Sequence, residues 1–208
     1  MPPGRPVNAV DGSSFWLDLP PDWLVLDPGS GRVLAQVAAL VQRAVAKDPA
    51  VAAHRGMIES EIRAVVAQAR SGDLSFCAML ATVVNDVLPM MATLTVAHRA
   101  VRDGADTSSM LSTLRRRPGA AVTRVQLASA GTAVRAVFRD KARGGGLDRP
   151  VQAAVCQYFI PTRSGVVVVT GATPLLPLAE HFADLFDAIA DSFTFTAADA
   201  ARAAEVPG

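Results

Sequence analysis

The sequence predicts an α+β fold, in which a mostly antiparallel sheet packs against helices and a helical hairpin is inserted between strands. Three observations support this prediction. Runs of β-branched and aromatic residues follow one another through the second half of the chain with only short turn signals between them, as expected of strands joined by hairpins. Two helical patterns stand together at 31–71, and another follows the last strand. Helices separated from strands in this way argue against a doubly wound parallel sheet.

The length of 208 residues suits one domain. We expect a flexible arm at 1–14, a single α+β domain at 15–196 and a flexible tail at 197–208. The inserted helical hairpin occupies 31–71, because apolar residues recur there at helical spacing and Pro49 breaks the pattern between two helices.

Turn residues delimit the predicted strands. Two short strands, 15–19 and 23–26, precede the helical hairpin, and the turn at Pro20-Pro21-Asp22 between them indicates that they pair with each other. The later predicted strands are 74–84, 89–99, 121–127, 132–142, 151–160 and 166–169, and a short helix that is capped at Asp106-Thr107 ends at Pro118-Gly119.

The stretch 151–195 organises the fold, because it combines two strands with the closing helix. Its run from Val166 to Val169 is typical of a strand at the centre of a sheet. In the helix, one face carries Leu178, Phe182, Leu185, Phe186, Ile189 and Phe193, and the other carries Glu180, Asp184, Asp187 and Asp191. The apolar face must lie across a sheet, and Phe186→Ala should cost roughly 3–5 kcal/mol if the ring is fully buried.

Composition bears on the cellular compartment. Cys77 and Cys156 both fall in predicted strands, where two buried free thiols are a better expectation than a disulfide. The chain has no apolar run as long as a membrane span, and its first residues lack the hydrophobic core of a signal peptide. We therefore expect a cytoplasmic protein, and the preference for Ala, Val and Arg is typical of a GC-rich bacterial genome.

The net charge of +1 hides an uneven distribution. Residues 106–165 contain ten basic and three acidic residues, whereas the rest of the chain to the C-terminus contains one basic and six acidic residues. Strand alternation places Arg135, Arg139 and Lys141 on one side of a predicted hairpin, whose other strand carries Arg124. These four cations are the candidate partner-binding residues, as one positive patch for an acidic partner. A solvated sheet face without any partner explains the same pattern.

The sequence contains no recognisable catalytic or metal-binding motif. His54, His98 and His181 fall on three different predicted elements, so no metal site is expected. The glycine run at 144–146 lacks the Gly-Lys-Ser/Thr ending of a phosphate loop, and no Gly-x-Ser-x-Gly elbow occurs. We therefore expect no catalytic residue and no cofactor. Nucleic acid is not an expected partner, because no aromatic residue interleaves with the arginines.

Both ends of the chain carry a recognisable pattern. The segment from Phe15 to Trp23, with sequence FWLDLPPDW, resembles the aromatic strand and Pro-Pro-Gly-Trp turn that open PsbP-like domains, with Asp22 where glycine is usual. Residues 157–161, 166–170 and 182–195 resemble the final hairpin and helix of the same family, which includes actinobacterial LpqN-type lipoproteins and Ran-binding relatives. The middle of the chain agrees only in the order of its elements. The resemblance implies an αβα sandwich in a family that mostly binds partners and shares no catalytic centre, so no functional residue is carried over.

We expect a non-enzymatic adaptor or accessory protein of a bacterial cell that binds another protein, with an acidic surface as the natural complement of the cations. The alternative is a carrier of a small ligand or lipid, with a pocket between the sheet and the helical hairpin, and a third reading is an enzyme of unrecognised type. The apolar stripes of the helical hairpin also favour a homo-oligomer or partner surface at 31–71. A membrane is not an expected partner.

Overall fold

The structure is a computed structural model, and it describes residues 7–8, 14–26, 74–84, 88–100, 107–142, 151–162 and 165–195, with five single positions between 35 and 46. The predicted helical hairpin at 31–71 lies outside the described residues, apart from those five positions. They are Ala35, Ala38, Ala39, Gln42 and Ala46, and all are helical and exposed. None of them belongs to the apolar stripe predicted for the first helix.

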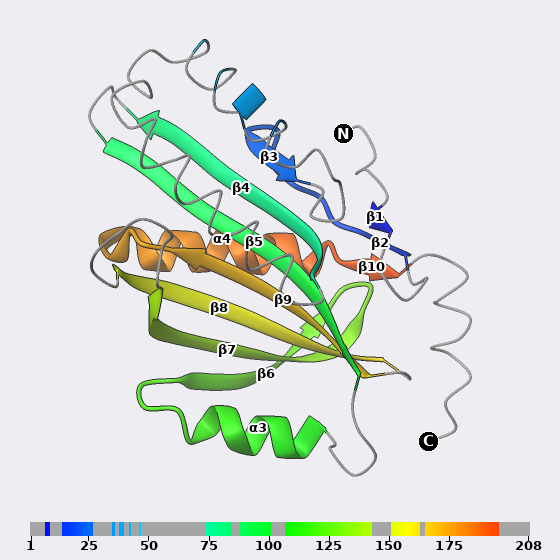
Figure 1. Ribbon diagram of the computed structural model, residues 1–208. Helices are drawn as coiled ribbons and strands as arrows, with labels where there is room; N and C mark the ends of the chain where they lie inside the picture. Colours follow the sequence, from blue (N-terminus) through cyan, green and yellow to red (C-terminus); the bar gives the residue numbers. More distant parts are fainter. Residues whose placement is uncertain are drawn as a thin grey trace.

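Seven strands form one antiparallel sheet, so the protein has the predicted α+β class (Figure 1). Their order across the sheet is β3-β4-β5-β9-β8-β7-β6. The strands are β3 (Trp23–Leu26), β4 (Leu74–Val84), β5 (Leu88–Ala100), β6 (Ala121–Leu127), β7 (Gly131–Ala142), β8 (Val151–Thr162) and β9 (Gly165–Thr173). The predicted strands of this sheet are therefore confirmed, with differences only at their ends.

β9 is the central strand, between β5 and β8. Val166, Val167 and Val169 are buried, because both faces of this strand are covered. The strand continues past its predicted end to Thr173, which is fully buried. The Thr173 hydroxyl donates to the carbonyl oxygen of Met91 at 2.8 Å, which satisfies its hydrogen-bonding need inside the core.

A second, three-stranded sheet joins the two ends of the described chain. β2 (Ser14–Trp16) lies between β1 (Val7–Asn8) and β10 (Thr194–Phe195). β1 falls within 1–14, the segment predicted as an arm. Residues 1–6 and 9–13 of that segment lie outside the described residues. The predicted tail at 197–208 lies outside them as well.

The prediction that 15–19 pairs with 23–26 is wrong. β2 pairs with β1 and β10, whereas β3 pairs with β4 of the large sheet. The physical reason is aromatic burial at the C-terminal end of the closing helix. Phe15 stacks on Phe193 with the ring centroids 5.2 Å apart, and Ser192 Oγ accepts a hydrogen bond of 2.9 Å from the Asp18 amide. The chain then turns, and Trp23 reaches a different sheet.

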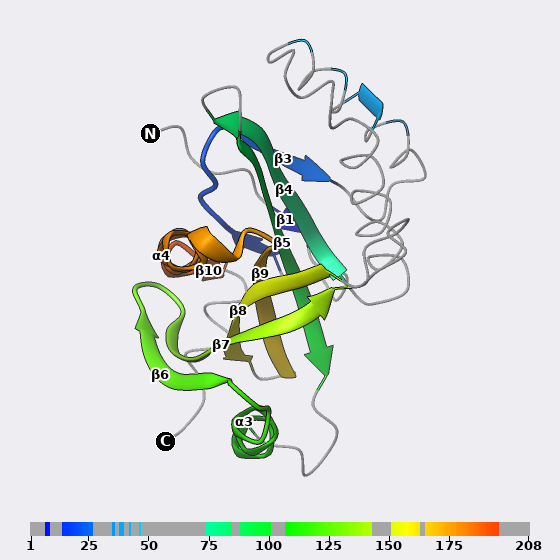
Figure 2. The same ribbon diagram turned by 90° about the vertical axis from the view of Figure 1, so that its left-hand side faces the viewer.

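The closing helix packs across one face of the seven-stranded sheet, which we name the α4 face. The 3-10 turn η2 (Leu176–Leu178) leads into α4 (Ala179–Asp191), and Figure 2 shows the helix beside the sheet. Phe182, Phe186 and Ile189 are buried in the core cluster between α4 and the strands, as the helical stripe predicts. Gly171 of β9 lies beneath Phe186 and allows this close approach.

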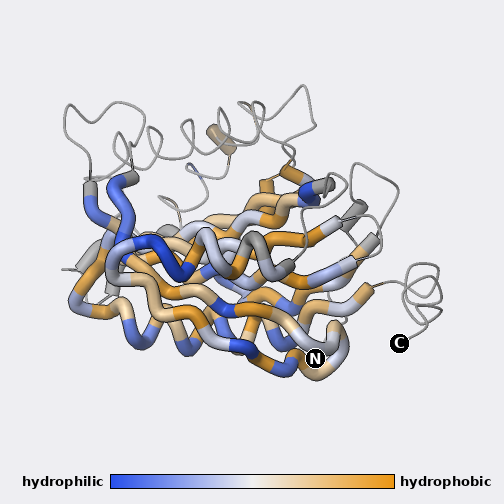
Figure 3. The backbone as a smooth tube through the Cα atoms, turned by 90° about the horizontal axis from the view of Figure 1, so that it is seen from below, coloured by the Kyte–Doolittle hydropathy of each residue, from blue (hydrophilic) through white to orange (hydrophobic). Residues whose placement is uncertain are grey.

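The short helix α3 (Thr107–Arg115) packs on the opposite face, at the β6 end of the sheet. Its Leu111 and Leu114 join a second cluster that contains Val134 and Phe138 of β7. Even-numbered β7 residues therefore face α3, and odd-numbered ones face α4. Figure 3 shows hydrophobic and hydrophilic residues alternating along the strands.

Two observations bear on the predicted compartment. Cys77 and Cys156 are both free and buried, as predicted, on strands β4 and β8, which are not neighbours. None of the helices that the structure describes is long and apolar enough to cross a bilayer. The location in the cell stays a prediction.

Candidate functional site

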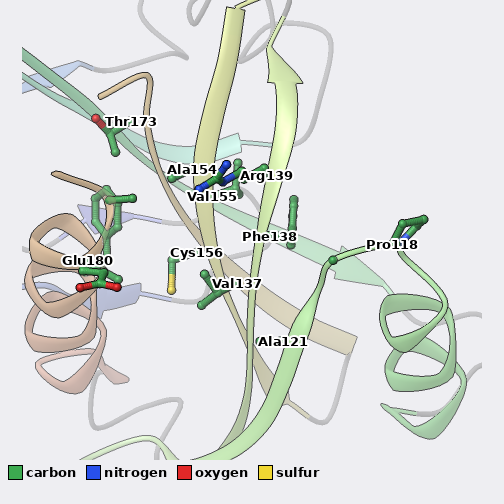
Figure 4. A pocket seen from close by; sticks show the side chains of 14 residues that line it. Pro118, Ala121, Val137, Phe138, Arg139, Ala154, Val155, Cys156, Thr173 and Glu180 are labelled. Atoms are coloured by element: carbon green, nitrogen blue, oxygen red, sulfur yellow. The ribbon is translucent and has the colours of Figure 1, made fainter. Parts of the chain in front are cut away.

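An apolar groove runs between α4 and strands β7 and β8 (Figure 4). Its volume is about 480 Å³, within the range of roughly 300–1,000 Å³ that is usual for small-molecule sites. The lining residues are Pro118, Gly119, Ala121, Val137, Phe138, Arg139, Ala154, Val155, Cys156, Thr173, Ala179, Glu180, Ala183 and Phe186. Most of them are apolar, so the groove suits the apolar part of a ligand.

Small side chains create this groove. Ala179 and Ala183 line it from α4, and Ala121 and Ala154 line it from the sheet. Over β9 the space between helix and sheet is filled by the Phe186 ring. Over β7 and β8, α4 presents Ala179 and Ala183, on successive turns, and the space between helix and sheet stays open there. The carrier alternative predicted a pocket between the sheet and the helical hairpin, and that hairpin lies outside the described residues. The groove described here is lined by α4 and by the sheet.

A second, polar pocket adjoins the groove. Its volume is about 250 Å³, and its lining residues are Arg117, Pro118, Arg139, Asp140, Lys141 and Gln152. Pro118 and Arg139 line both spaces, which therefore meet at these residues. The pairing of β6 with β7 ends at Ala121 and Val137, and β7 continues to Ala142. The polar pocket forms along this extension of β7.

Arg117 has its own partners inside this pocket. Its Nη2 forms a salt bridge of 2.5 Å with Asp140 Oδ2, and its guanidinium carbon lies 3.9 Å from the centre of the Phe138 ring. The charges of Arg117 and Asp140 compensate each other. No ion pair connects Arg139 or Lys141 with another residue in the described part of the chain. The net positive charge of the pocket therefore belongs to Arg139 and Lys141.

A chain of hydrogen bonds leads from the groove to the flank of α4. The Cys156 thiol, which lines the groove, donates to the Tyr158 hydroxyl at 3.1 Å. That hydroxyl donates to Asp187 Oδ1. Asp187 also accepts two hydrogen bonds from the Arg135 guanidinium, of 2.6 Å from Nε to Oδ1 and 2.9 Å from Nη2 to Oδ2. This chain of Cys156, Tyr158, Asp187 and Arg135 ties β7 and β8 to the helix.

Tyr158, Cys156 and Arg135 keep their ordinary protonation states in this chain. Burial, followed by the hydrogen bond to Asp187, raises the pKa of the Tyr158 hydroxyl well above its usual range. Burial also raises the pKa of the Cys156 thiol. For Arg135, burial lowers the pKa, but the hydrogen bonds with Asp187 and Tyr158 outweigh it and the net shift is upward. A neutral thiol is a poor nucleophile.

The position of Asp187 differs from the sequence prediction. The helical pattern places Asp187 and Asp191 on the face of α4 away from the sheet. In the structure, Asp187 meets Arg135, and Asp191 Oδ1 accepts a hydrogen bond of 2.8 Å from the Ala128 amide. The reason is the curvature of the sheet, whose β6–β7 end curls around the flank of α4 (Figure 2).

The four predicted partner-binding cations do not form one patch. Arg135 is half-buried and paired with Asp187, so its charge is compensated inside the protein. Arg124 is the register partner of Val134, which puts it on the α3 side of the hairpin, opposite Arg135. Arg139 and Lys141 are exposed on the α4 face. Their role in binding a partner stays a prediction.

The remaining candidates for chemistry are dispersed. His54 lies outside the described residues, and His98 and His181 lie on β5 and α4. Among the residues that the structure describes, no group of three His, Cys, Asp or Glu side chains could hold a metal ion. The groove itself was not predicted. Its trace in the helix sequence is the pair Ala179 and Ala183, which stand four residues apart and therefore lie on the same side of the helix.

Comparison with known proteins finds one structural likeness to report. No protein-family model matches the sequence, and no curated protein matches it. The structure is similar to the crystal structure of LpqN, a protein involved in cell envelope biogenesis of Mycobacterium tuberculosis. The sequence identity is 17%, the TM-score is 0.45, and the match covers 92% of this chain and 90% of that chain. No residue role is transferred at this degree of similarity.

Proposed function

We propose that this protein is a non-enzymatic binding protein that holds the apolar part of a small ligand in the groove beside α4. The observation that carries this proposal is the groove, with its volume of about 480 Å³ and its lining of alanine, valine and phenylalanine. Each CH₂ group that leaves water for such a site contributes roughly 0.8 kcal/mol. An alkyl chain of several such groups therefore offsets the cost of association.

The polar chain beside the groove supports a binding role over a catalytic one. Cys156 lines the groove, and burial raises the pKa of its thiol, which keeps the thiol neutral. Tyr158 and Asp187 are themselves engaged in holding α4. These groups hold α4 against β7 and β8 beside the groove and supply no activated nucleophile.

Titration with dodecanol, an uncharged alkyl probe, tests the proposal. Trp23 is buried and packs edge-on against the Phe186 ring, with centroids 6.5 Å apart, so tryptophan fluorescence reports on the groove wall. We expect saturable binding to the natural chain. Ala183→Leu should abolish it by filling the groove, whereas Ala188→Leu, on the exposed side of the same helix, should not. Equal affinity in all three proteins, or no binding to any, would falsify the proposal.

A second candidate function is the predicted adaptor for an acidic protein. It is supported by the exposure of Arg115, Arg116, Arg124, Arg139 and Lys141. Binding of poly-glutamate at low and high salt tests it, because exposed charges are screened over about 8–10 Å at physiological salt. We expect Arg124→Gln to weaken that binding. An unchanged affinity would show that the α3 face takes no part.

We also propose that the chain is a cytoplasmic PsbP-like domain, whose helical hairpin at 31–71 completes an αβα sandwich and mediates self-association. Helices on both faces of the sheet support the sandwich. The contact of Phe15 with Phe193 also supports it, because it joins the two segments that resemble the family. An experimental structure that includes 31–71 tests the fold. Sedimentation tests self-association, and a strictly monomeric protein would contradict it.

A further inference from the structure

The polar pocket indicates the chemistry of the ligand. Arg139 and Lys141 lie on the α4 face of β7, and Gln152 of β8 is the register partner of Lys141 on the same face. All three line the polar pocket, and Arg139 also lines the groove. The apolar groove therefore ends at a group of hydrogen-bond donors, two of which carry a positive charge.

The neighbouring charges leave this end of the groove positive. Arg117 and Asp140 form an ion pair with each other, so neither changes the balance. Glu180 lines the groove from the first turn of α4, and in Figure 4 it lies on the helix side of the groove, across from Arg139. An anionic group is therefore repelled at the helix side and attracted at the β7 side, which fixes the orientation of a ligand.

We propose that the ligand is a single-chain anionic amphiphile, a long-chain carboxylate, with its alkyl chain in the groove and its carboxylate at Arg139, Lys141 and Gln152. This inference deepens the proposed function and rests on it. The guanidinium fork of Arg139 matches the two oxygens of a carboxylate, and Lys141 and Gln152 offer further donors. A ligand carboxylate would supply the missing counter-charge of Arg139 and Lys141, since no described residue forms an ion pair with either cation.

Three single-chain probes of closely similar length test the inference, namely dodecanoate, dodecanol and dodecyltrimethylammonium, each used below the concentration at which it forms micelles. We expect dodecanoate to bind at least about tenfold more tightly than dodecanol, since hydrogen bonds to a charged group are the strong ones. The cationic probe should bind most weakly. Added salt should weaken the binding of dodecanoate and leave that of dodecanol unchanged.

Matched variants locate the carboxylate. Arg139→Gln with Lys141→Gln should reduce the affinity for dodecanoate to that for dodecanol, with no change for dodecanol itself. Arg124→Gln removes an exposed arginine that lines neither space, and should change neither affinity. Glu180→Gln should strengthen the binding of dodecanoate slightly, by removing the repulsion at the helix side.

The outcomes separate this inference from the proposed function. Equal affinities for dodecanoate and dodecanol, or an equal loss of both in the double variant, would overturn the carboxylate site and leave the groove as an uncharged binding site. Tighter binding of the cationic probe would overturn it as well. Failure of all three probes to bind would overturn the proposed function, and the inference with it.

Discussion

Gly171 of β9 lies directly beneath the ring of Phe186 on α4. A Cβ atom at position 171 would lie 2.4 Å from Cγ of Phe186 and 2.5 and 2.6 Å from its two Cδ atoms, which is too close for any side chain. The glycine therefore sets the distance between helix and sheet at the centre of the core. Phe186 lines the groove too, so the same contact fixes one wall of the proposed binding site.

Gly171→Ala should destabilise the protein by about 1–3 kcal/mol, because the new methyl group forces Phe186 and α4 to move. Urea denaturation measures the free energy of unfolding. Phe186→Ala alone should cost roughly 3–5 kcal/mol, since the ring is buried. In the double variant, Gly171→Ala should cost far less than it does alone, because the clash is gone. Additive costs would show that the methyl group is accommodated elsewhere.

Asp187→Ala should cost about 1–3 kcal/mol, because it removes the acceptor of Tyr158 and the partner of Arg135 together. Both members of the ion pair are partly exposed, so we place the cost in the lower half of that range. Asp187→Asn should cost less, since the amide oxygen can still accept from Tyr158. Equal unfolding midpoints for the natural chain and Asp187→Ala would show that the hydrogen-bond chain is not stabilising.

Arg135→Glu should be more damaging than Arg135→Gln, because it places two carboxylates face to face. Thermal unfolding of the two variants checks the order. Arg139→Glu is the matched control on the same face of β7, and it should leave the unfolding temperature nearly unchanged because Arg139 is exposed.

Tyr158 is the only tyrosine of the chain, so phenolate absorbance reports on it alone. Burial raises its pKa, and the hydrogen bond to Asp187 acts in the same direction. Tyr158 therefore keeps its phenolic proton in the native state at pH values at which the unfolded chain loses it. This contribution to stability is complete below the unfolded pKa of about 10 and is lost as the pH rises above it. Tyr158→Phe should remove this alkaline loss. A phenolate signal near pH 10 in the folded protein would contradict the buried hydrogen bond.

Both thiols should react slowly with a disulfide reagent in the folded protein. Burial raises the pKa of Cys77 to about 12, and it raises the pKa of Cys156 as well. Cys156 lines the groove and Cys77 does not, so Cys156 should be the faster of the two. Bound dodecanol should slow Cys156 only. The variants Cys77→Ser and Cys156→Ser assign the two rates, and a ligand effect on Cys77 would place the ligand elsewhere.

One residue in a turn explains why Arg124 does not share a face with Arg135. A turn at 128–131 would pair Arg124 with Arg135 and put both on one face. In the structure the turn spans only 128–130, and Gly131 begins β7 with φ of 80°, a conformation that glycine adopts readily. The register therefore shifts by one residue, which moves every side chain of β6 to the other face relative to β7.

The sequence by itself determined the features that depend on local periodicity. Val166 to Val169 identified the central strand, and the spacing of Phe182, Phe186 and Ile189 identified the helix and its buried face. These features could be predicted because the period of two in a strand and of 3.6 in a helix is a property of the backbone.

Only the tertiary structure decided which elements meet. β2 pairs with β10 and not with β3, Asp187 turns toward Arg135, and Ala183 borders a groove instead of a filled core. Each of these results depends on residues far apart in the chain and on the curvature of the sheet around α4. Such contacts are selected by how well the assembled surfaces fill space and compensate charge, and no local pattern encodes that.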